Sequence, residues 1–524
     1  MIHSTHITFK IALFFSAFFI CTESFVSQDI IDLSPGAEKL SYIKETGEHR
    51  LIGDIHLSYQ NVIFYCDSAS YFEGKSILKA YGNVHLNKSN TLNLYCDSLV
   101  YFGNKQHATL WGHVKVMDKS YKITTDTLFF DTKNELGIYH HWGKISHTLT
   151  SEKISSKNGY FYPKTNQFTV SGNVVYTSEK TKMNTDSLHY NPIKKRVYFF
   201  GKTNVKQTDG ISLKGNKGWY NTETEESLLL QQASIKDKQQ ELYGDSLYSN
   251  PQKNSVIAQN NVIYKDSSKH LFLTGNKLTM NKKKRSSFLT GNPLIHYGLK
   301  KNTLIVSADT LFLFTDSLDG INEIKGYKNS CFFSKQTQGI CDSIHYSKKT
   351  NRLDLLHNPI LWSNKIEIKG GIISLLIKDS SIQKATIYKN ATAISKVDTF
   401  YFNQLGGKIM HAYFDSTNQV KRIEVSENAK TIYYPEEKTE SDTLTTITRK
   451  GMNRIYASEI KVDVNKGKFS KVTYTKQVDG LFYPIAKINT EEQFIQGFHW
   501  FPTLRPKNKT DLLLRRTKKK DSTL

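Results

Sequence analysis

Cysteine and proline are scarce in this sequence, and convincing helical periodicity is absent beyond its first residues. The 524 residues include five cysteines and ten prolines, and no long low-complexity stretch interrupts them. This composition excludes an extended disordered region ahead of the C-terminal end. Cys and His never come at the spacing of a metal site, so we expect no metal and no cofactor. No nucleophile stands beside a base, and we therefore expect no enzyme.

Long apolar runs are also missing, with one exception near the N-terminus. The run Ile11–Cys21 is eleven residues long, which is too short to cross a bilayer of about 30 Å as a helix. A run of this length is typical of a signal peptide, and we expect one over residues 1–27, with cleavage near Ser24 or Ser27. An uncleaved anchor is the alternative. No small residue precedes Cys21, which disfavours a lipid anchor there.

What the sequence does have is a repeat of about thirty residues. Each copy begins with an Asp-Ser-Leu-x-Tyr-like motif and ends with a Gly-Asn-Val-like motif, and thirty residues separate Asp67 from Asp97. A fixed period of this length predicts an array of equivalent units, with function in what the array makes collectively. The clearest starts are 96–101, 125–130, 185–190, 244–248, 308–313 and 341–346, and the clearest ends are 82–84, 172–174, 260–262 and 291–293.

Apolar and polar residues alternate within each unit. The positions two and four places after the Asp are apolar in most copies, as at Leu99 and Tyr101. Such short alternation, bounded by Gly, Asn and Asp, is typical of strands. Each unit is therefore predicted to be two short strands joined by a polar turn, and the whole chain an all-β, elongated solenoid of stacked two-stranded repeats. The predicted inward positions are Tyr71, Leu99, Tyr101, Val114, Leu128, Phe130, Tyr162, Leu188, Tyr190, Leu311, Leu313, Ile344 and Tyr346.

Stacked units of this kind would build two facing sheets whose inner surfaces carry these positions. If the sheets meet, the positions form an ordinary dry core. If the sheets splay on one side, the same positions line a long apolar groove. The sequence leaves both alternatives open.

Two cysteines occupy equivalent places in neighbouring units. Cys66 and Cys96 each stand just before the repeat Asp, and adjacent strands lie about 4.8 Å apart, near the lower limit for a disulfide. Export would permit such a bond. A disulfide and two buried free thiols are equally compatible with the pattern.

The net charge is strongly positive, at +23, and this predicts an anionic partner. For an exported protein that partner is a phosphorylated lipid or a membrane surface rather than nucleic acid. The densest basic segment is the C-terminal tail, which is either a solvated tail or a contact for the membrane surface. Its basic residues are Arg505, Lys507, Lys509, Arg515, Arg516, Lys518, Lys519 and Lys520.

The recurring aspartates allow an enzyme as an alternative, because stacked carboxylates on a β-solenoid can cleave polysaccharides. In most copies, however, the Asp stands beside Ser or Thr at the start of a strand. A carboxylate at such a place accepts hydrogen bonds from the backbone amides of the turn. Catalysis needs one distinctive site, so identical repeated positions favour a structural role. The aspartates concerned are Asp67, Asp97, Asp126, Asp186, Asp245, Asp309 and Asp342.

The ordered repetition of these motifs resembles the OstA/LptA repeat of lipopolysaccharide transport. Three late segments, 407–414, 423–435 and 497–500, are similar to the longer OstA-like proteins of Bacteroidota. The resemblance covers about residues 45 to 505. It implies a periplasmic β-jellyroll whose groove shields lipopolysaccharide acyl chains, with Lys and Arg at the rim for the lipid phosphates. It also implies docking to other jellyroll proteins by addition of edge strands.

The length of the chain departs from the short members of that family. We expect two consecutive jellyrolls, at residues 28–295 and 296–490, followed by a basic tail at residues 491–524. Too few residues follow the repeats for a sizeable transmembrane barrel. A structural or adhesive β-solenoid with a closed core is the alternative, and the polysaccharide-cleaving solenoid is the third.

Overall fold

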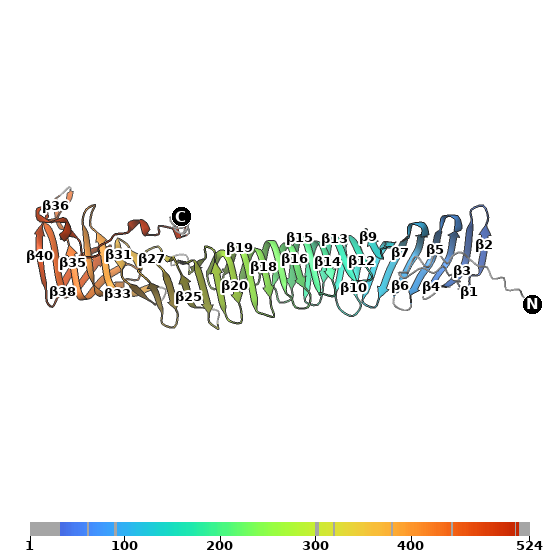
Figure 1. Ribbon diagram of the computed structural model, residues 1–524, viewed down its shortest axis with the longest axis horizontal. Coiled ribbons are helices and arrows are strands. Elements are labelled where there is room, and N and C mark those ends of the chain that lie inside the picture. Colours follow the sequence, from blue (N-terminus) through green and yellow to red (C-terminus); the bar gives the residue numbers. More distant parts are fainter. Residues whose placement is uncertain are drawn as a thin grey trace, which may run out of the picture. The chain divides into compact units, whose positions relative to one another are not determined.

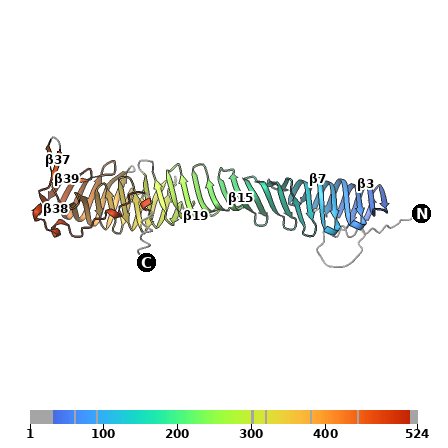
Figure 2. The ribbon, with the colours of Figure 1, turned by 90° about the horizontal axis from the view of Figure 1, so that it is seen from above.

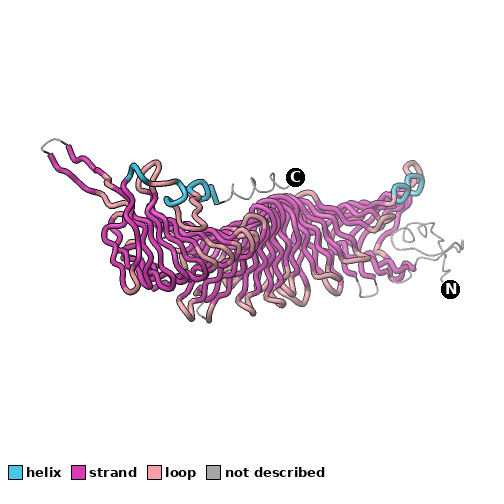
Figure 3. Tube along the Cα trace, turned by 60° about the vertical axis from the view of Figure 1, so that its left-hand side comes forward, coloured by secondary structure: helices cyan, strands magenta, loops and turns pink. Residues whose placement is uncertain are grey.

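The structure is a computed structural model that describes residues 32–512, except for 60–61, 89–91, 299–302, 318–319, 379–380, 442–443 and 509. The predicted signal peptide lies outside the described residues, as do Lys509 and the basic residues from Arg515 onward. Nearly all of the described chain is strand, and its helices are short 3-10 turns (Figure 3). The predicted all-β fold of stacked repeats is therefore confirmed.

The chain divides into two compact units, and the boundary runs through one strand. Unit 1 comprises residues 1–238 and 246–252, and unit 2 comprises residues 239–245 and 253–524. The strand that both units share is β18 (Gln240–Asn250). The expected division into two jellyrolls between residues 295 and 296 stays a prediction.

In unit 1 the strands follow one another side by side (blue to green in Figure 1). They are β1 (Asp32–Gly36), β2 (Lys39–Ile43), β3 (Glu48–Tyr59), β4 (Val62–Phe72), β5 (Ile77–Lys88), β6 (Leu92–Phe102), β7 (His107–Asp118), β8 (Tyr121–Asp131), β9 (Leu136–Tyr139), β10 (Gly143–His147), β11 (Lys153–Ser156), β12 (Asn158–Tyr162), β13 (Gln167–Thr177), β14 (Thr181–Asn191), β15 (Arg196–Gln207), β16 (Ser212–Asn221) and β17 (Ser227–Lys236), with η1 (Glu73–Lys75) and η2 (Gly103–Lys105).

Unit 2 continues with shorter strands that lengthen again toward its end (Figure 2). They are β19 (Ser255–Asp266), β20 (Leu271–Asn281), β21 (Ser286–Thr290), β22 (Leu294–Tyr297), β23 (Leu304–Ser307), β24 (Thr310–Thr315), β25 (Ile321–Tyr327), β26 (Ser330–Phe333), β27 (Thr337–Cys341), β28 (Ser343–Ser347), β29 (Arg352–Leu356), β30 (Ile360–Ser363), β31 (Ile366–Lys369), β32 (Ile372–Lys378), β33 (Ser381–Lys396), β34 (Phe402–Phe414), β35 (Val420–Tyr433), β36 (Glu437–Ser441), β37 (Leu444–Thr448), β38 (Gly451–Asn465), β39 (Lys468–Thr475) and β40 (Asp479–Pro484), with η3 (Ile485–Lys487), η4 (Thr490–Gln493) and η5 (Pro502–Leu504).

Each long strand of unit 1 contributes to two sheets, because it bends in its middle. In β4 the buried residues fall on every second position up to Cys66, and the alternation then shifts phase and resumes at Ala69. The antiparallel register shifts at the same point, which is the mark of a β-bulge. We call the bend the corner. The part of β4 before the corner lies in sheet I, and the part after it lies in sheet II.

In unit 2 the two sheets are built largely from separate short strands. Sheet I pairs β20, β22, β23, β26, β27, β30, β31 and β33 in that order. Sheet II pairs β20, β21, β24, β25, β28, β29, β32 and β33. The long strands β20 and β33 belong to both sheets and join them. Strands β36 and β37 form a hairpin of their own.

The Gly-Asn-Val motif of the repeat makes the corner rather than the end of a unit. Gly82 and Asn83 have φ values of +71° and +45°, and Gly112 and His113 have +73° and +48°. Two successive left-handed residues favour Gly and Asn, because both tolerate positive φ. A Cβ on Gly112 would lie 2.2 Å from Asp97 Oδ2, so glycine is required there for space as well.

The repeat Asp binds the corner of the following strand. Asn83 Nδ2 donates to Asp67 Oδ2 at 3.1 Å, and the backbone N of Lys202 donates to Asp186 Oδ2 at 2.9 Å. The same bond recurs in unit 2, for example from Asn261. The aspartates therefore have a structural role at the corners of successive strands, which supports the turn-capping interpretation over the catalytic one.

One predicted inward residue, Tyr162, faces outward. Its side chain is 38% exposed, whereas Phe161 is 5% exposed and faces the interior. The prediction took Asn158 as the equivalent of the repeat Asp. The corner Gly172 instead lies over Lys157, as Gly112 lies over Asp97. The inward positions are therefore shifted by one residue, and this shift moves every side chain to the other face.

The disulfide considered between Cys66 and Cys96 is not formed, and the spacing argument for it was wrong. Cys66 lies on β4 and Cys96 on β6, and β5 pairs with both strands. Equivalent residues of successive units are thus two strands apart, about 9.6 Å, beyond the reach of a disulfide. Both cysteines are buried free thiols, the second of the two alternatives.

Burial should lower the reactivity of these two thiols, and this effect can be measured. Burial, followed by the charges of Asp67 and Asp97, raises the pKa of Cys66 and of Cys96 to about 12. Both thiols should therefore stay protonated and resist iodoacetamide at pH 8 in the native protein, and react fully in denaturant. Mass spectrometry of peptides reads out both states. Equal labelling of native and unfolded protein would contradict the burial of the two thiols. A linked pair of peptides with a mass two hydrogens below the sum of the two would show that the disulfide forms.

The residues after β40 fold back onto unit 2 rather than forming a free tail. We call residues 489–508 and 510–512 the strap, which runs from β40 toward β27 (red in Figure 1). Arg505 Nε donates to Gln338 Oε1 at 2.8 Å, and Leu512 packs with Leu294 and Cys331. Arg505, predicted as part of a basic tail, is thus held by the sheet.

The strap covers the outer face of sheet I. A row of outward residues crosses this sheet in register, from Gln338 through Trp362 and Glu367 to Gln404. All four are at most 3% exposed. Phe501 N donates to Glu367 Oε2 at 3.1 Å, so backbone of the strap satisfies a buried carboxylate. Sheet I of unit 2 is therefore buried on both faces.

Candidate functional site

The candidate site is the interior between the two sheets, since most predicted positions lie there. Ten of the thirteen positions are at most 6% exposed. Phe130 and Tyr346 are half-buried, and Tyr162 is the outward exception described above. The ten buried positions are Tyr71, Leu99, Tyr101, Val114, Leu128, Leu188, Tyr190, Leu311, Leu313 and Ile344. Their part in lipid binding stays a prediction.

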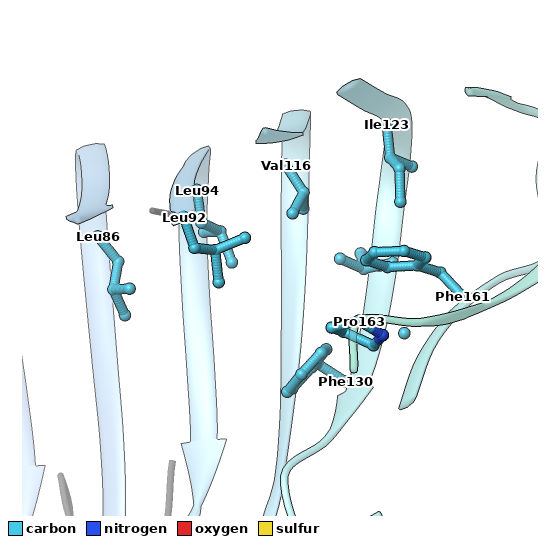
Figure 4. Close-up of a pocket in the computed structure, with 10 residues that line it drawn as sticks. Leu86, Leu92, Leu94, Val116, Ile123, Phe130, Phe161 and Pro163 are labelled. Atoms are coloured by element: carbon cyan, nitrogen blue, oxygen red, sulfur yellow. The ribbon is translucent and has the colours of Figure 1, made fainter. Parts of the chain in front are cut away.

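In unit 1 the interior is nearly filled. A narrow cleft lies between the sheets, with Leu94, Val116 and Ile123 on sheet I and Phe130 and Phe161 on sheet II (Figure 4). Every residue that lines it is apolar or glycine. The space inside is about 20 Å³, which is little more than one water molecule requires. The interior of unit 1 is therefore closely packed around this cleft.

Hydrogen bonds also join the two sheets on the side of unit 1 opposite the corners. Thr181, at the start of β14 in sheet I, lies 3.1 Å from the hydroxyl of Tyr220 in sheet II. Gln207 Nε2 donates to the same hydroxyl at 3.2 Å. Tyr220 is 1% exposed, and its burial raises its pKa. These bonds join the two sheets at β14 to β16.

Unit 2 contains a larger cavity between its sheets. The cavity measures about 330 Å³, within the usual range for ligand pockets. Its apolar lining comes from both sheets: Ile295, Tyr297, Leu304, Val306 and Phe332 from sheet I, and Ile321, Ile324, Ile344, Tyr346, Leu353, Ile377 and Ile382 from sheet II. It is large enough and apolar enough for part of a lipid chain.

Polar and cationic groups also line this cavity. Lys335 and Lys348 line it together with Asn351. Lys348 Nζ lies 2.8 Å from Asp316 Oδ2, and this contact raises the pKa of Lys348, which stays cationic. Burial raises the pKa of Tyr346, so its hydroxyl stays neutral. An apolar chamber that is also lined by cations suits an amphiphile with an anionic head.

Sequence reasoning found two residues of this cavity and missed the rest. Ile344 and Tyr346 were predicted as inward positions, and both line it. Ile295, Val306 and Phe332 were missed, because β22, β23 and β26 do not begin with the repeat Asp. The signal that could have found them is the apolar character of these four-residue strands. In β22 and β26 consecutive residues are buried, so both faces of each strand contain buried side chains.

A metal site requires clustered ligands, and a membrane-spanning helix requires a long apolar segment. Among residues 32–512, apart from the gaps given above, no three His, Cys, Asp or Glu side chains form a group suited to a metal ion. In the same residues, no helix is both long and apolar enough to cross a membrane.

Comparisons with known proteins agree with the repeat. Residues 35–186 and 169–255 match the model of a family described as OstA-like protein. None of the curated proteins matches this chain. Nineteen chains of solved structures match. One is LptH of Pseudomonas aeruginosa, described as the LptA-homologous periplasmic component of a lipopolysaccharide transport device. It is 12% identical over 29% of this chain and 82% of LptH, and the TM-score of 0.16 is too low to carry an argument.

Proposed function

We propose that this chain, whose residues 35–186 and 169–255 match the model of the OstA-like family, is a non-enzymatic protein of lipopolysaccharide transport in the periplasm. Its ligand is lipopolysaccharide or a related anionic glycolipid, whose acyl part lies between the two sheets. The cavity of unit 2 is the observation that carries this proposal, since its lining combines apolar side chains with Lys335 and Lys348.

The energetics favour an acyl chain as the occupant. Each methylene removed from water contributes roughly 0.8 kcal/mol to the free energy of binding. Both sheets supply buried apolar side chains to the cavity wall, such as Phe332 from sheet I and Ile324 from sheet II. A phosphate in the cavity would meet Lys335, which is exposed, and Lys348. The role needs binding and release and no catalytic residue.

The filled interior of unit 1 favours a different role for that unit. The cleft between Leu94, Val116 and Phe130 offers about 20 Å³, which is less than an acyl chain needs. This observation supports the alternative of a structural β-solenoid with a closed core, restricted to unit 1. The proposal therefore assigns lipid binding to unit 2 and a scaffold role to unit 1.

Docking to other jellyroll proteins is proposed at the end of unit 2. Among the described strands, β39 and β40 each pair with β38 alone, so each has an unpaired edge. On β40, Leu481 and Phe482 are 63% and 54% exposed. An unpaired edge beside exposed apolar side chains suits the addition of a partner strand.

Photo-crosslinking in cells tests the lipid proposal. A benzophenone amino acid in place of Tyr346 should capture lipopolysaccharide, because this side chain lines the cavity. The same residue in place of Tyr162, which faces outward, is the matched control and should capture none. Immunoblotting for lipopolysaccharide on the purified chain reads out the adduct.

A third position distinguishes the two units. Phe130 lines the narrow cleft of unit 1, and we expect no lipid adduct there. An adduct at both Phe130 and Tyr346 would mean that unit 1 opens to admit lipid. Absence of an adduct at both, with adducts to protein alone, would remove the lipid proposal.

A further inference from the structure

The corners of unit 1 carry a row of exposed aromatic side chains that the lipid proposal does not use. Tyr81 on β5 and Trp111 on β7 each precede the corner glycine, and Trp142 lies at the bend between β9 and β10. They are 46%, 39% and 53% exposed. We call these three residues the aromatic edge.

Tyr81 and Trp111 lie in one register row, whereas Trp142 takes the corner position that His113 takes on β7, because Gly143 and Val114 are both opposite Thr125. Tyr81 is opposite Ser98, and Ser98 is opposite Trp111, so one strand separates the two rings. Adjacent strands lie about 4.8 Å apart, which puts the rings about 9.6 Å apart. Trp111 is opposite Thr127 on β8, and Thr125 Oγ1 donates to the backbone oxygen of Trp142 at 2.9 Å. Trp142 thus follows one strand beyond β8.

Small residues between the rings leave the ring faces uncovered. In the described residues, no ring or cation stacks on any member of the aromatic edge. Another outward row of unit 1 shows the contrast. There Tyr65, His85 and Tyr95 follow on adjacent strands, and their centroids are 5.5 Å and 4.3 Å apart in stacked pairs. In that row each ring face is covered by the neighbouring ring, whereas the rings of the aromatic edge do not stack on one another.

Carboxylates alternate with these rings along the corners. Asp67, Asp97 and Asp126 lie on β4, β6 and β8, the strands between and beside the aromatic ones, and all three are exposed. The side chain of Asp97 is 61% exposed while it binds His113. A carboxylate offers about four acceptor positions, so each keeps capacity for further donors. Their charge disfavours an anionic occupant.

We propose that the aromatic edge binds an unbranched, uncharged polysaccharide that runs along the corners of unit 1. The apolar C–H faces of sugar rings stack on the aromatic rings, and sugar hydroxyls donate to the neighbouring carboxylates. The separation of about 9.6 Å between Tyr81 and Trp111 matches the length of two sugar units in an extended chain, and Trp142 offers a further ring at the next corner. This site lies on the outer surface and is independent of the cavity in unit 2.

Titration of the full chain with two neutral probes, chitohexaose and cellohexaose, tests this site. At least one should bind saturably, with a change in tryptophan fluorescence and a heat signal in calorimetry. Trp111→Ala and Tyr81→Ala should each weaken binding about tenfold or more, equivalent to 1.4 kcal/mol or more. Tyr162→Ala removes a ring exposed elsewhere on unit 1 and should leave binding unchanged.

The proposal is overturned if neither oligosaccharide binds, or if binding persists at full strength in both edge variants. Tighter binding of an anionic glycan such as hyaluronate would also overturn it, since the carboxylates should repel that chain. Thermal unfolding of each variant at the wild-type temperature shows that the fold is intact, which the exposure of these side chains leads us to expect.

Discussion

Replacement of Leu188 by Asp should unfold unit 1 or destabilise it by at least about 4 kcal/mol. Leu188 is 1% exposed and pairs in register with Val170 and Phe199, which are 1% and 0% exposed. A carboxylate there would be buried without a partner, and such a charge costs several kcal/mol. Chemical denaturation followed by circular dichroism measures the loss.

Asp186→Asn, two residues away, is the matched control. It changes a carboxylate that accepts from the backbone N of Lys202 at 2.9 Å at the corner, and it should cost about 1 kcal/mol or less. A Leu188→Asp variant of wild-type stability that binds less lipid would mean that the interior of unit 1 is an open groove. Loss of an enzymatic activity in Asp186→Asn would revive the hydrolase alternative.

Removal of the strap should destabilise unit 2 by about 3 to 6 kcal/mol, since the strap buries Ile495 and Leu512 and each such side chain contributes about 1.5 to 3 kcal/mol. Ile495 is 5% exposed and packs with Ile432 and Met452. Loss of the strap would also leave Glu367 without the donor that Phe501 supplies. Truncation after Lys487 is the variant to make.

Hydrogen exchange locates the effect of this truncation. The amides of β30 and β31 should exchange faster, because the strap covers Trp362 and Glu367 on these strands. A truncation after Leu512 keeps every described contact of the strap and should exchange as the full chain does. Unchanged protection of β30 and β31 after the longer truncation would show that the strap does not stabilise sheet I.

Much of the fold could be predicted because the relevant signals are local. Alternation with a period of two follows from strand geometry alone, and it identified Leu99, Tyr101, Leu188 and Tyr190 as inward residues, all at most 2% exposed. The thirty-residue period likewise identified equivalent units without any knowledge of how they pair.

The errors arose where strand pairing decides the outcome. Tyr162 was assigned inward because Asn158, rather than Lys157, was taken as the corner residue, and only the position of Gly172 across the strand pair reveals the difference. The Cys66–Cys96 disulfide failed because one repeat contributes two strands, so equivalent residues are not neighbours.

The location of the cavity and of the strap could not be predicted from local pattern. Ile295 and Tyr346 lie far apart in sequence and share the cavity because sheets I and II face each other. The C-terminal segment reads as a polar, basic tail, yet Arg505 is bound to Gln338 across 167 residues. Such contacts depend on which faces remain uncovered after the sheets have formed.

The sequence by itself determined that this protein is an all-β stack of thirty-residue units, because side-chain alternation and left-handed Gly-Asn pairs act on the nearest residues. Only the tertiary structure decided that side chains of both sheets surround a narrow cleft in unit 1 and a larger cavity in unit 2. It also showed that aspartates such as Asp67 and Asp186 accept hydrogen bonds from the corner of the following strand. The distance between two sheets depends on how side chains from distant strands fill the space between them, and no local pattern encodes that sum.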